Sequence, residues 1–252
     1  MSMSPDELKR FERERADAAA PRSLAWYAQD GVRSLSEIAT VRHHARLKPN
    51  HRVLEVGCGV GRIAMSLARS CAHVTATDLS PKSVEQLSLH AGERRLKNIQ
   101  PQCIDANSID FHECFDRVVA VQVVQHIPSL ELRRDAVHRM LKALKPEGKA
   151  ILVHYRWGGI IRESKEGAHD DGRYRIAFTA EDLVDLLESV GFTRVRVTGC
   201  VNLPYRVYTM MRRWPAIVTQ VDVALSLSRV SRSLGHYLIG TGVRPKTFAF
   251  PR

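Results

Sequence analysis

Short, largely apolar runs recur through the middle of the chain, and several of them stop at a glycine or an acidic residue. They occupy residues 53–56, 73–78, 102–105, 115–124 and 149–153, and helical patterns of apolar residues separate them. Runs of this length that are rich in β-branched residues are typical of strands buried on both faces of a parallel sheet. Strands that alternate with helices predict one α/β domain.

Helical patterns also precede and interrupt this series of strands. They lie at residues 5–19 and 34–47, before the first strand, and at residues 129–143, after the fourth. Helices in these places would supply the layers that cover the sheet. We therefore expect an N-terminal helical cap over residues 1–48, followed by a core over residues 49–200.

The end of the core predicts one more helix and one more strand. Thr179, with two acids after it, is typical of a helix N-cap, and Gly191 is typical of the C-cap that ends such a helix. A sixth strand follows at residues 193–198. Glycines, charges and aromatic residues between positions 158 and 175 predict a loop over the edge of the active site.

A helical insertion is predicted over residues 201–235, before a last strand at residues 237–242. Four apolar residues repeat in it at 4-3-4 spacing and would form one helical stripe: Val223, Leu227, Val230 and Leu234. We expect this stripe to pack on the body of the protein. A lid, a dimer contact and a membrane-surface helix are the alternatives.

A glycine-rich turn between the first strand and the next helix is the most informative segment. It has the form Glu55-x-Gly57-x-Gly59-x-Gly61. Glycine permits a positive φ and lets a ligand approach the backbone, because it has no Cβ. Unpaired amides at the start of the following helix favour an anionic group. The spacing differs from the G-x-G-x-x-G of dinucleotide sites, since Arg62 stands where the third glycine would be.

Five segments together resemble the class I S-adenosylmethionine-dependent methyltransferases, in the branch that acts on small molecules. They are the glycine turn, the strands that end at Asp78 and Asp105, F-D-x-V…V-x-x-H-I at residues 115–127, and L-K-P-x-G at residues 144–148. The resemblance covers about residues 50–200. It implies S-adenosylmethionine as the cofactor. It also implies a Rossmann-like, doubly wound sheet of seven strands, mostly parallel with an antiparallel last strand.

Asp78 ends the second strand just before Ser80 and Pro81, which are typical of a helix start. A carboxylate at this point can accept both ribose hydroxyls of a nucleotide, whereas a turn or capping role is the alternative. The resemblance places Asp105 at the adenine amino group, and Asp110 is a rival for that role. It implies the following cofactor-binding residues: Glu55, Gly57, Cys58, Gly59, Gly61, Asp78, Leu79, Asp105, Ala106 at the adenine ring and Gln122 beside the methionine part.

The predicted reaction makes few chemical demands. Methyl transfer from a sulfonium is an in-line displacement, so the enzyme mainly positions the reactants and excludes water. A base is needed only for a poorly ionised hydroxyl or a carbon acid. The candidates are His126, His154 and Tyr155, which we expect near the ends of the fourth and fifth strands; a packing role is the alternative for His126. We expect a metal-independent enzyme whose acceptor is a small molecule, a lipid or a glycan intermediate.

Length and composition fit this interpretation. The chain has 252 residues, of which 44% are hydrophobic, as is ordinary for a single globular α/β domain. No charge-free run of about 18 apolar residues occurs, and residues 5–17 lack the apolar centre of a secretory signal. Five cysteines without C-x-x-C spacing predict free thiols in a reducing compartment, so we expect a cytoplasmic protein.

The net charge of +11 is concentrated near the C-terminus. Residues 192–252 contain ten lysines and arginines but a single acid, Asp222. Such a region attracts anionic partners, although a solvated basic face is the alternative. We expect an anionic substrate or a peripheral membrane contact through this basic region. The oligomeric state is not predicted.

Two other functions fit parts of the sequence. A nicotinamide-dependent oxidoreductase would use a similar strand–turn–helix unit, but the glycine spacing argues against it. A non-catalytic nucleic-acid-binding protein would use the basic C-terminal region. The chain lacks the clustered aromatic residues on which single-stranded nucleic acid stacks, so this second function is disfavoured.

Overall fold

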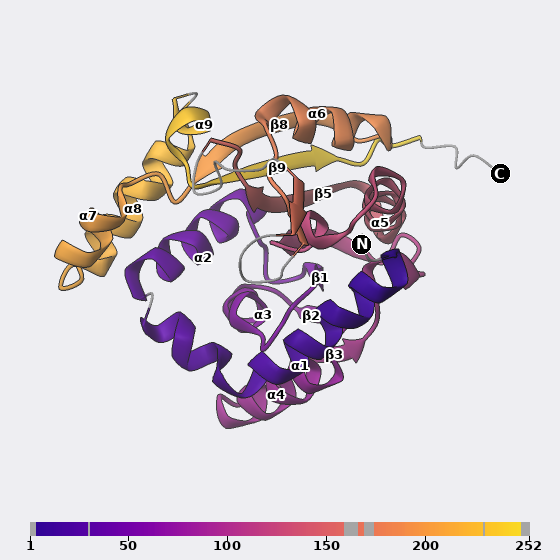
Figure 1. Ribbon diagram of the computed structural model, residues 1–252, viewed down its shortest axis with the longest axis horizontal. Helices are drawn as coiled ribbons and strands as arrows, with labels where there is room; N and C mark the ends of the chain where they lie inside the picture. The colour runs from indigo at the N-terminus through magenta and orange to yellow at the C-terminus, as the bar shows by residue number, and fades with distance from the viewer. Residues whose placement is uncertain (1–3, 30, 159–165, 169–173, 229, 248–252) are drawn as a thin grey trace.

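The computed structural model describes residues 4–29, 31–158, 166–168, 174–228 and 230–247 (Figure 1). A central sheet separates two hydrophobic clusters, one on each face, and helices complete both clusters. The α/β fold class expected from the alternating strands and helices is therefore confirmed.

The central sheet has seven strands in the order β3-β2-β1-β4-β5-β9-β8. They are β1 (Arg52–Val56), β2 (His73–Asp78), β3 (Ile99–Cys103), β4 (Phe115–Val121), β5 (Leu144–Tyr155), β8 (Thr193–Cys200) and β9 (Tyr237–Val243). Strands β1 to β5 pair in parallel, whereas β9 is antiparallel to both of its neighbours, β5 and β8. This is the predicted doubly wound arrangement with an antiparallel last strand. The strand order changes direction at β1 and β4, where such sheets bind ligands at their carboxyl ends.

Helices pack around these strands, and most of those predicted individually begin within one residue of the expected start. They are α1 (Pro5–Gln29), α2 (Gly31–Ala45), α3 (Arg62–Leu67), α4 (Pro81–Glu93), α5 (Leu130–Ala143), α6 (Ala180–Ser189), α7 (Tyr205–Met210), α8 (Pro215–Ser226) and α9 (Ser231–Leu234). The side chains of Ser80, Ser129 and Thr179 each cap a helix by accepting a backbone N–H of its first turn. Gly191 follows α6 with φ of 104°, in the left-handed region that suits a helix end.

The N-terminal helix is longer than predicted. The pattern indicated residues 5–19, but α1 continues through Pro21 to Gln29. A proline ordinarily ends a helix because it has no N–H and its ring crowds the preceding turn. Here three alanines precede Pro21, and their strong helix propensity favours continuation. The second helix likewise starts earlier, at Gly31 instead of residue 34.

The segment predicted as a loop over the active site lies largely outside the described residues. Its described parts form a small antiparallel ribbon of β6 (Glu166–Ala168) and β7 (Tyr174–Ile176). Strand β7 lies next to the short turn η3 (Val124–His126), which follows β4. The ribbon therefore reaches the end of β4, beside the predicted site.

Of the apolar stripe predicted in the insertion, Val223 is half-buried near α2, but the other three residues do not pack on the body of the protein. Helix α8 ends at Ser226 and α9 begins at Ser231, so the stripe is divided between two helices. Leu227, Val230 and Leu234 are all exposed. The buried face of α8 instead carries Val218, Asp222 and Ser226. Asp222 can point inward because the Asn202 backbone N–H and the Tyr208 hydroxyl donate to its carboxylate, at 2.7 and 2.6 Å.

Candidate active site

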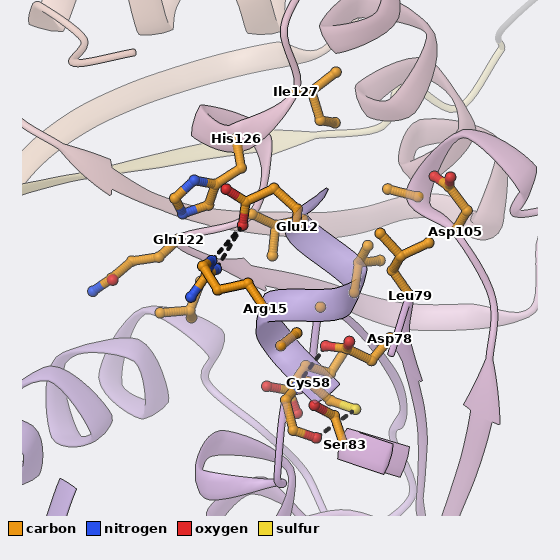
Figure 2. Close-up of a pocket in the computed structure, with 18 of the residues that line it drawn as sticks. Glu12, Arg15, Cys58, Asp78, Leu79, Ser83, Asp105, Gln122, His126 and Ile127 are labelled. Carbon is orange, nitrogen blue, oxygen red and sulfur yellow. Dashed lines mark hydrogen bonds and ion pairs between the residues drawn. The ribbon is translucent and has the colours of Figure 1, made fainter. Parts of the chain in front are cut away.

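A cavity of about 870 Å³ opens at the carboxyl ends of β1, β2 and β4 (Figure 2). Helices α1 and α2 form its other wall. Its size is within the range of sites that hold small molecules or cofactors. Most of the predicted cofactor residues line it, together with His126 and Tyr155.

The three glycines of the turn have different roles. All three have positive φ: 69° at Gly57, 51° at Gly59 and 91° at Gly61. A Cβ on Gly61 would lie 2.1 Å from Leu87 Cδ1 of α4, and one on Gly57 would lie 2.2 Å from a methyl group of Val123. A Cβ on Gly59 would meet no atom within 4 Å. Gly59 thus borders open cavity, whereas Gly61 allows helix packing and does not line the cavity.

Asp78 connects the glycine turn to the start of α4. Its carboxylate accepts the backbone N–H of Gly59 at 2.7 Å and that of Ser80 at 2.9 Å. Burial raises the pKa of this carboxyl, and the two amide hydrogen bonds partly oppose that rise. Cys58 and Leu79 line the cavity beside it. The side chain is therefore fixed beside the glycine turn, where it lines the cavity.

The structure distinguishes Asp105 from its rival. Asp105 lines the cavity with Ala106, accepts the backbone N–H of Asn107 at 2.8 Å, and forms an ion pair with Lys9 of α1. The Asp110 side chain is 81% exposed and bonds to His112 outside the cavity. Only Asp105 lies where it could meet a bound nucleotide.

A second group of polar residues lies where β1, β4 and α2 meet. Gln122 donates to Glu37 of α2 at 3.0 Å, and Arg62 forms an ion pair with the same carboxylate. Glu55 is almost fully buried, which raises its pKa to about 8. Its Oε2 atom has no hydrogen-bond partner among the described residues. A buried oxygen in this condition can accept a donor from a ligand in the cavity.

His126 follows β4 and lies at the other end of the cavity. Its Nδ1 is 2.9 Å from the Tyr174 carbonyl oxygen, so Nδ1 carries the proton and donates it. Gln125 uses its amide oxygen to accept Tyr155 N–H at 2.8 Å, which leaves its amide nitrogen, 3.4 Å from His126 Nε2, as the donor. Both contacts leave Nε2 as the basic nitrogen. Burial lowers the pKa of His126, while the negative charge of Glu12 opposes that shift.

The other two candidate bases lie on opposite faces of β5. Tyr155 lines the cavity, and its ring centroid is 5.5 Å from that of Tyr237. His154 is fully buried, and its ring packs against Phe178 at 4.7 Å, on the face turned away from the cavity. Burial lowers its pKa to about 3. Because successive side chains of a strand point to opposite faces, His154 lies away from the acceptor that Tyr155 would face, contrary to its predicted catalytic role.

Several lining residues were not identified from the sequence. On α1, Glu12 and Arg15 form an ion pair with 3.0 Å between Oε2 and Nε, and Figure 2 shows Glu12 beside His126. Helix α2 contributes Glu37, and α3 contributes Arg62. Pairs of opposite charges at i and i+3 are common on any exposed helix, so the sequence did not mark Glu12 and Arg15 as residues of a site. Glu37 could have been noticed, because it is an acid on the same face of its helix as the apolar Val41, and that face is buried.

Comparisons with known proteins identify a methyltransferase domain in the chain. Residues 53–148 match the protein family described as a methyltransferase domain. Over 148 residues, the chain is 30% identical to the ubiquinone biosynthesis O-methyltransferase of Xanthomonas axonopodis pv. citri, covering 56% of this chain and 61% of that protein. The protein of that name from Vibrio cholerae is 26% identical over 226 residues, which cover 82% of this chain and 86% of that one.

The chain also matches a small part of a very large protein. Over 121 residues it is 32% identical to the nonribosomal peptide synthetase CymA of Salinispora arenicola, which is 47% of this chain and 2% of CymA. The chain thus spans about three fifths of the Xanthomonas relative and a small fraction of CymA.

Solved structures share the fold. DhpI in its SAH complex has a TM-score of 0.66 at 16% identity, over 95% of this chain and 98% of that chain. Phosphoethanolamine N-methyltransferase 2 of Haemonchus contortus, in complex with S-adenosyl-L-methionine, has a TM-score of 0.60 at 18% identity, over 83% and 52% of the two chains. At these identities the likeness shows a common architecture and nothing about the acceptor.

Proposed function

Because its methyltransferase domain places the chain in the class I, S-adenosylmethionine-dependent methyltransferase family, we propose that the protein methylates an oxygen atom of a small molecule. One observation carries this proposal: a single cavity contains both the cofactor residues, from Gly59 to Asp105, and a basic nitrogen, His126 Nε2. Because the chain matches a methyltransferase family, we no longer propose the alternative function of a nicotinamide-dependent oxidoreductase.

The residues of the cavity fit S-adenosylmethionine. Gly59 leaves open space where a side chain would stand, and Asp78 and Asp105 present carboxylates that suit ribose hydroxyls and the adenine amino group. The unpartnered Oε2 of Glu55 suits the ammonium group of the methionine part, and Gln122 lies nearby. Gly61 supports the turn through packing and is no longer proposed as a direct contact.

In the proposed mechanism, S-adenosylmethionine held by Asp78, Asp105 and Glu55 would supply a methyl group activated by its sulfonium, and would leave as S-adenosylhomocysteine once the bond from sulfur to that methyl group breaks. His126 takes the proton of the acceptor hydroxyl on Nε2, as that oxygen forms its bond to the methyl carbon. The Tyr174 carbonyl accepts from Nδ1–H and so fixes the tautomer in which Nε2 is unprotonated; the acceptor hydroxyl would take the place of the Gln125 amide nitrogen, which lies 3.4 Å from Nε2. Tyr155 forms the wall against which the acceptor rests, and α1 and α2 exclude water from the reaction.

An oxygen acceptor is supported by two observations. The curated relatives from Xanthomonas and Vibrio are named as O-methyltransferases of ubiquinone biosynthesis. A hydroxyl is also the acceptor that needs a base, and a neutral histidine with a lowered pKa is available in the cavity. Residues 1–48 would act as a helical cap, since α1 and α2 contribute Glu12, Arg15 and Glu37 to this end.

The acceptor that we propose carries negative charge. Two guanidinium groups lie over aromatic rings at this end: Arg33 is 5.9 Å from the centroid of Tyr237, and Arg175 is 5.7 Å from that of Tyr155. We also propose a cytoplasmic location, supported by the five free cysteines, and a peripheral membrane contact through the basic C-terminal region. In the described part of the chain, no helix has both the length and the hydropathy to cross a bilayer.

Transfer of a labelled methyl group tests the proposal. The protein is incubated with labelled S-adenosylmethionine and a panel of small acidic phenols, matched by amines of the same skeleton. We expect label in methyl ethers, with loss of transfer when the phenol is already methylated. Label found in the amines alone would contradict the choice of oxygen. A protein that binds the cofactor product yet labels neither set would contradict the proposed acceptor class.

A further inference from the structure

Helix α8 has its polar and apolar faces reversed relative to an ordinary surface helix. Its single charged residue, Asp222, is fully buried, whereas Ile217 and Val221 are about half exposed. A surface helix of a water-soluble domain normally turns its apolar stripe inward and its charges outward. On the buried side of α8, the Asp222 carboxylate accepts hydrogen bonds from Asn202 and Tyr208, while the apolar side chains of Ile217 and Val221 face outward.

The exposed apolar residues extend beyond α8 into its neighbours. Six of them define what we call the α7–α9 surface: Met210, Trp214, Ile217, Val221, Leu227 and Val230. Met210 is 78% exposed, and Trp214 is 56% exposed. Isolated exposed apolar residues are normal, but a concentration on three consecutive elements marks an interaction site. Figure 1 shows α7, α8 and α9 along one margin of the molecule, beyond α2.

Arginines flank this apolar surface. Arg206, Arg212 and Arg213 are exposed on and after α7, and Arg232 is exposed on α9. From residue 192 to the C-terminus the only acid is Asp222, which is buried. The surface therefore combines apolar side chains, a tryptophan at their edge and positive charge without exposed acids. This is the composition of segments that lie in the interface of anionic membranes.

We infer that the α7–α9 surface docks on an anionic bilayer, with its apolar side chains among the lipid chains and its arginines at the headgroups. A second copy of the chain is a poorer occupant. A twofold interface would place the same arginines opposite one another, and this part of the chain offers no exposed acid to neutralise them. Lipid phosphates supply the missing negative charge.

Docking would bring the active-site wall close to the bilayer. Helix α8 packs against α2, and α2 lines the cavity through Arg33, Ser34 and Glu37. An amphipathic acceptor held at the membrane surface would thus lie near the entrance to the acceptor end. This consequence for the substrate rests on the proposed methyl transfer, and the docking surface specifies the membrane contact proposed above.

The test is cosedimentation of the full chain with vesicles of phosphatidylcholine, with or without phosphatidylglycerol. We expect binding only to the anionic vesicles, weakened by salt. The arginine pair R212Q/R213Q should weaken binding about 30-fold, at about 1 kcal/mol for each arginine. The apolar pair I217S/V221S should weaken it at least tenfold, since each side chain loses apolar contact with lipid. Leu89→Ser and Arg94→Gln, both on or just after α4, are the matched controls and should bind like wild type.

Three outcomes would overturn the inference. They are equal binding by all variants, no binding of wild type to anionic vesicles, and a concentration-dependent dimer that the apolar pair abolishes while vesicle binding is absent. Titration with S-adenosylhomocysteine is run on the same samples. Unchanged affinity in the variants shows that their fold and cofactor site are intact. A wild type that docks on vesicles but transfers no methyl group would contradict the proposed reaction alone.

Discussion

His126 is the residue on which the proposed chemistry depends most. Because burial lowers its pKa, Nε2 stays unprotonated and able to act as a base at a lower pH than a solvent-exposed histidine would. We expect kcat to stay constant down to a pH below the usual histidine range, and to fall only there. His126→Asn should lower kcat about 100-fold or more and leave S-adenosylhomocysteine affinity unchanged.

His112→Asn is the matched control for this prediction, since His112 is exposed and bonds to Asp110 outside the cavity. Its kcat and pH profile should be those of wild type. A His126→Asn enzyme with unchanged kcat, or with the same acid limb as wild type, would remove the base role. His126 would then be a packing residue, which was the alternative for it in the sequence.

Glu55 should leave a signature in the pH dependence of stability. Its pKa is about 8 in the folded protein, against an ordinary value of 4.5 that applies when the chain is unfolded. Between these values the folded protein holds a proton that the unfolded chain releases, so the free energy of unfolding falls as pH rises. Glu55→Gln holds no titrating proton. We expect denaturant titrations to show a smaller loss of stability between pH 4.5 and 8 in the variant than in wild type. Parallel curves for the two proteins would mean that Glu55 ionises normally.

At the scale of elements, the glycine turn uses Gly61 for packing against α4 and Gly59 for binding the cofactor. Gly61→Ala should lower the free energy of unfolding by about 3 kcal/mol, because its Cβ would overlap Leu87 and its φ is positive. Gly92→Ala on α4, where a Cβ meets nothing within 4 Å, should instead raise it by about 0.5–1 kcal/mol. Gly59→Ala should fold but bind S-adenosylhomocysteine at least tenfold more weakly. Equal stability of the Gly61 and Gly92 variants, measured by urea denaturation, would contradict the packing role.

The elements of the core were predictable because their signals are local. A buried strand, its terminal acid and the following capped helix all appear within a few residues, as at Asp78 and Ser80. The sequence failed where tertiary contacts override local pattern. The helical pattern was followed only to residue 19, whereas α1 continues through Pro21 to Gln29. Leu227 and Val230 had the spacing of one helical stripe, but α8 ends at Ser226 and both residues lie exposed between α8 and α9.

At the scale of the whole molecule, the cavity joins segments that lie far apart in the chain. Its cofactor end comes from consecutive strands, so one motif predicted it. Its acceptor end comes from α1, α2 and the ends of β5 and β9, which no single motif connects. Glu12 and His126 are an example: neither position indicates the other before the chain has folded. His154 was misplaced for a related reason, since strand alternation decides which side of the sheet a residue faces.

Calorimetric titration with S-adenosylhomocysteine tests the central claim, that the cavity at the ends of β1, β2 and β4 holds the cofactor. The account predicts one site with micromolar affinity in wild type, lost in Asp78→Ala because Asp78 fixes Gly59 and faces the ligand. Asp110→Ala, which changes an exposed carboxylate outside the cavity, should bind like wild type. No binding by wild type, or equal binding by the Asp78→Ala and Asp110→Ala proteins, would contradict it.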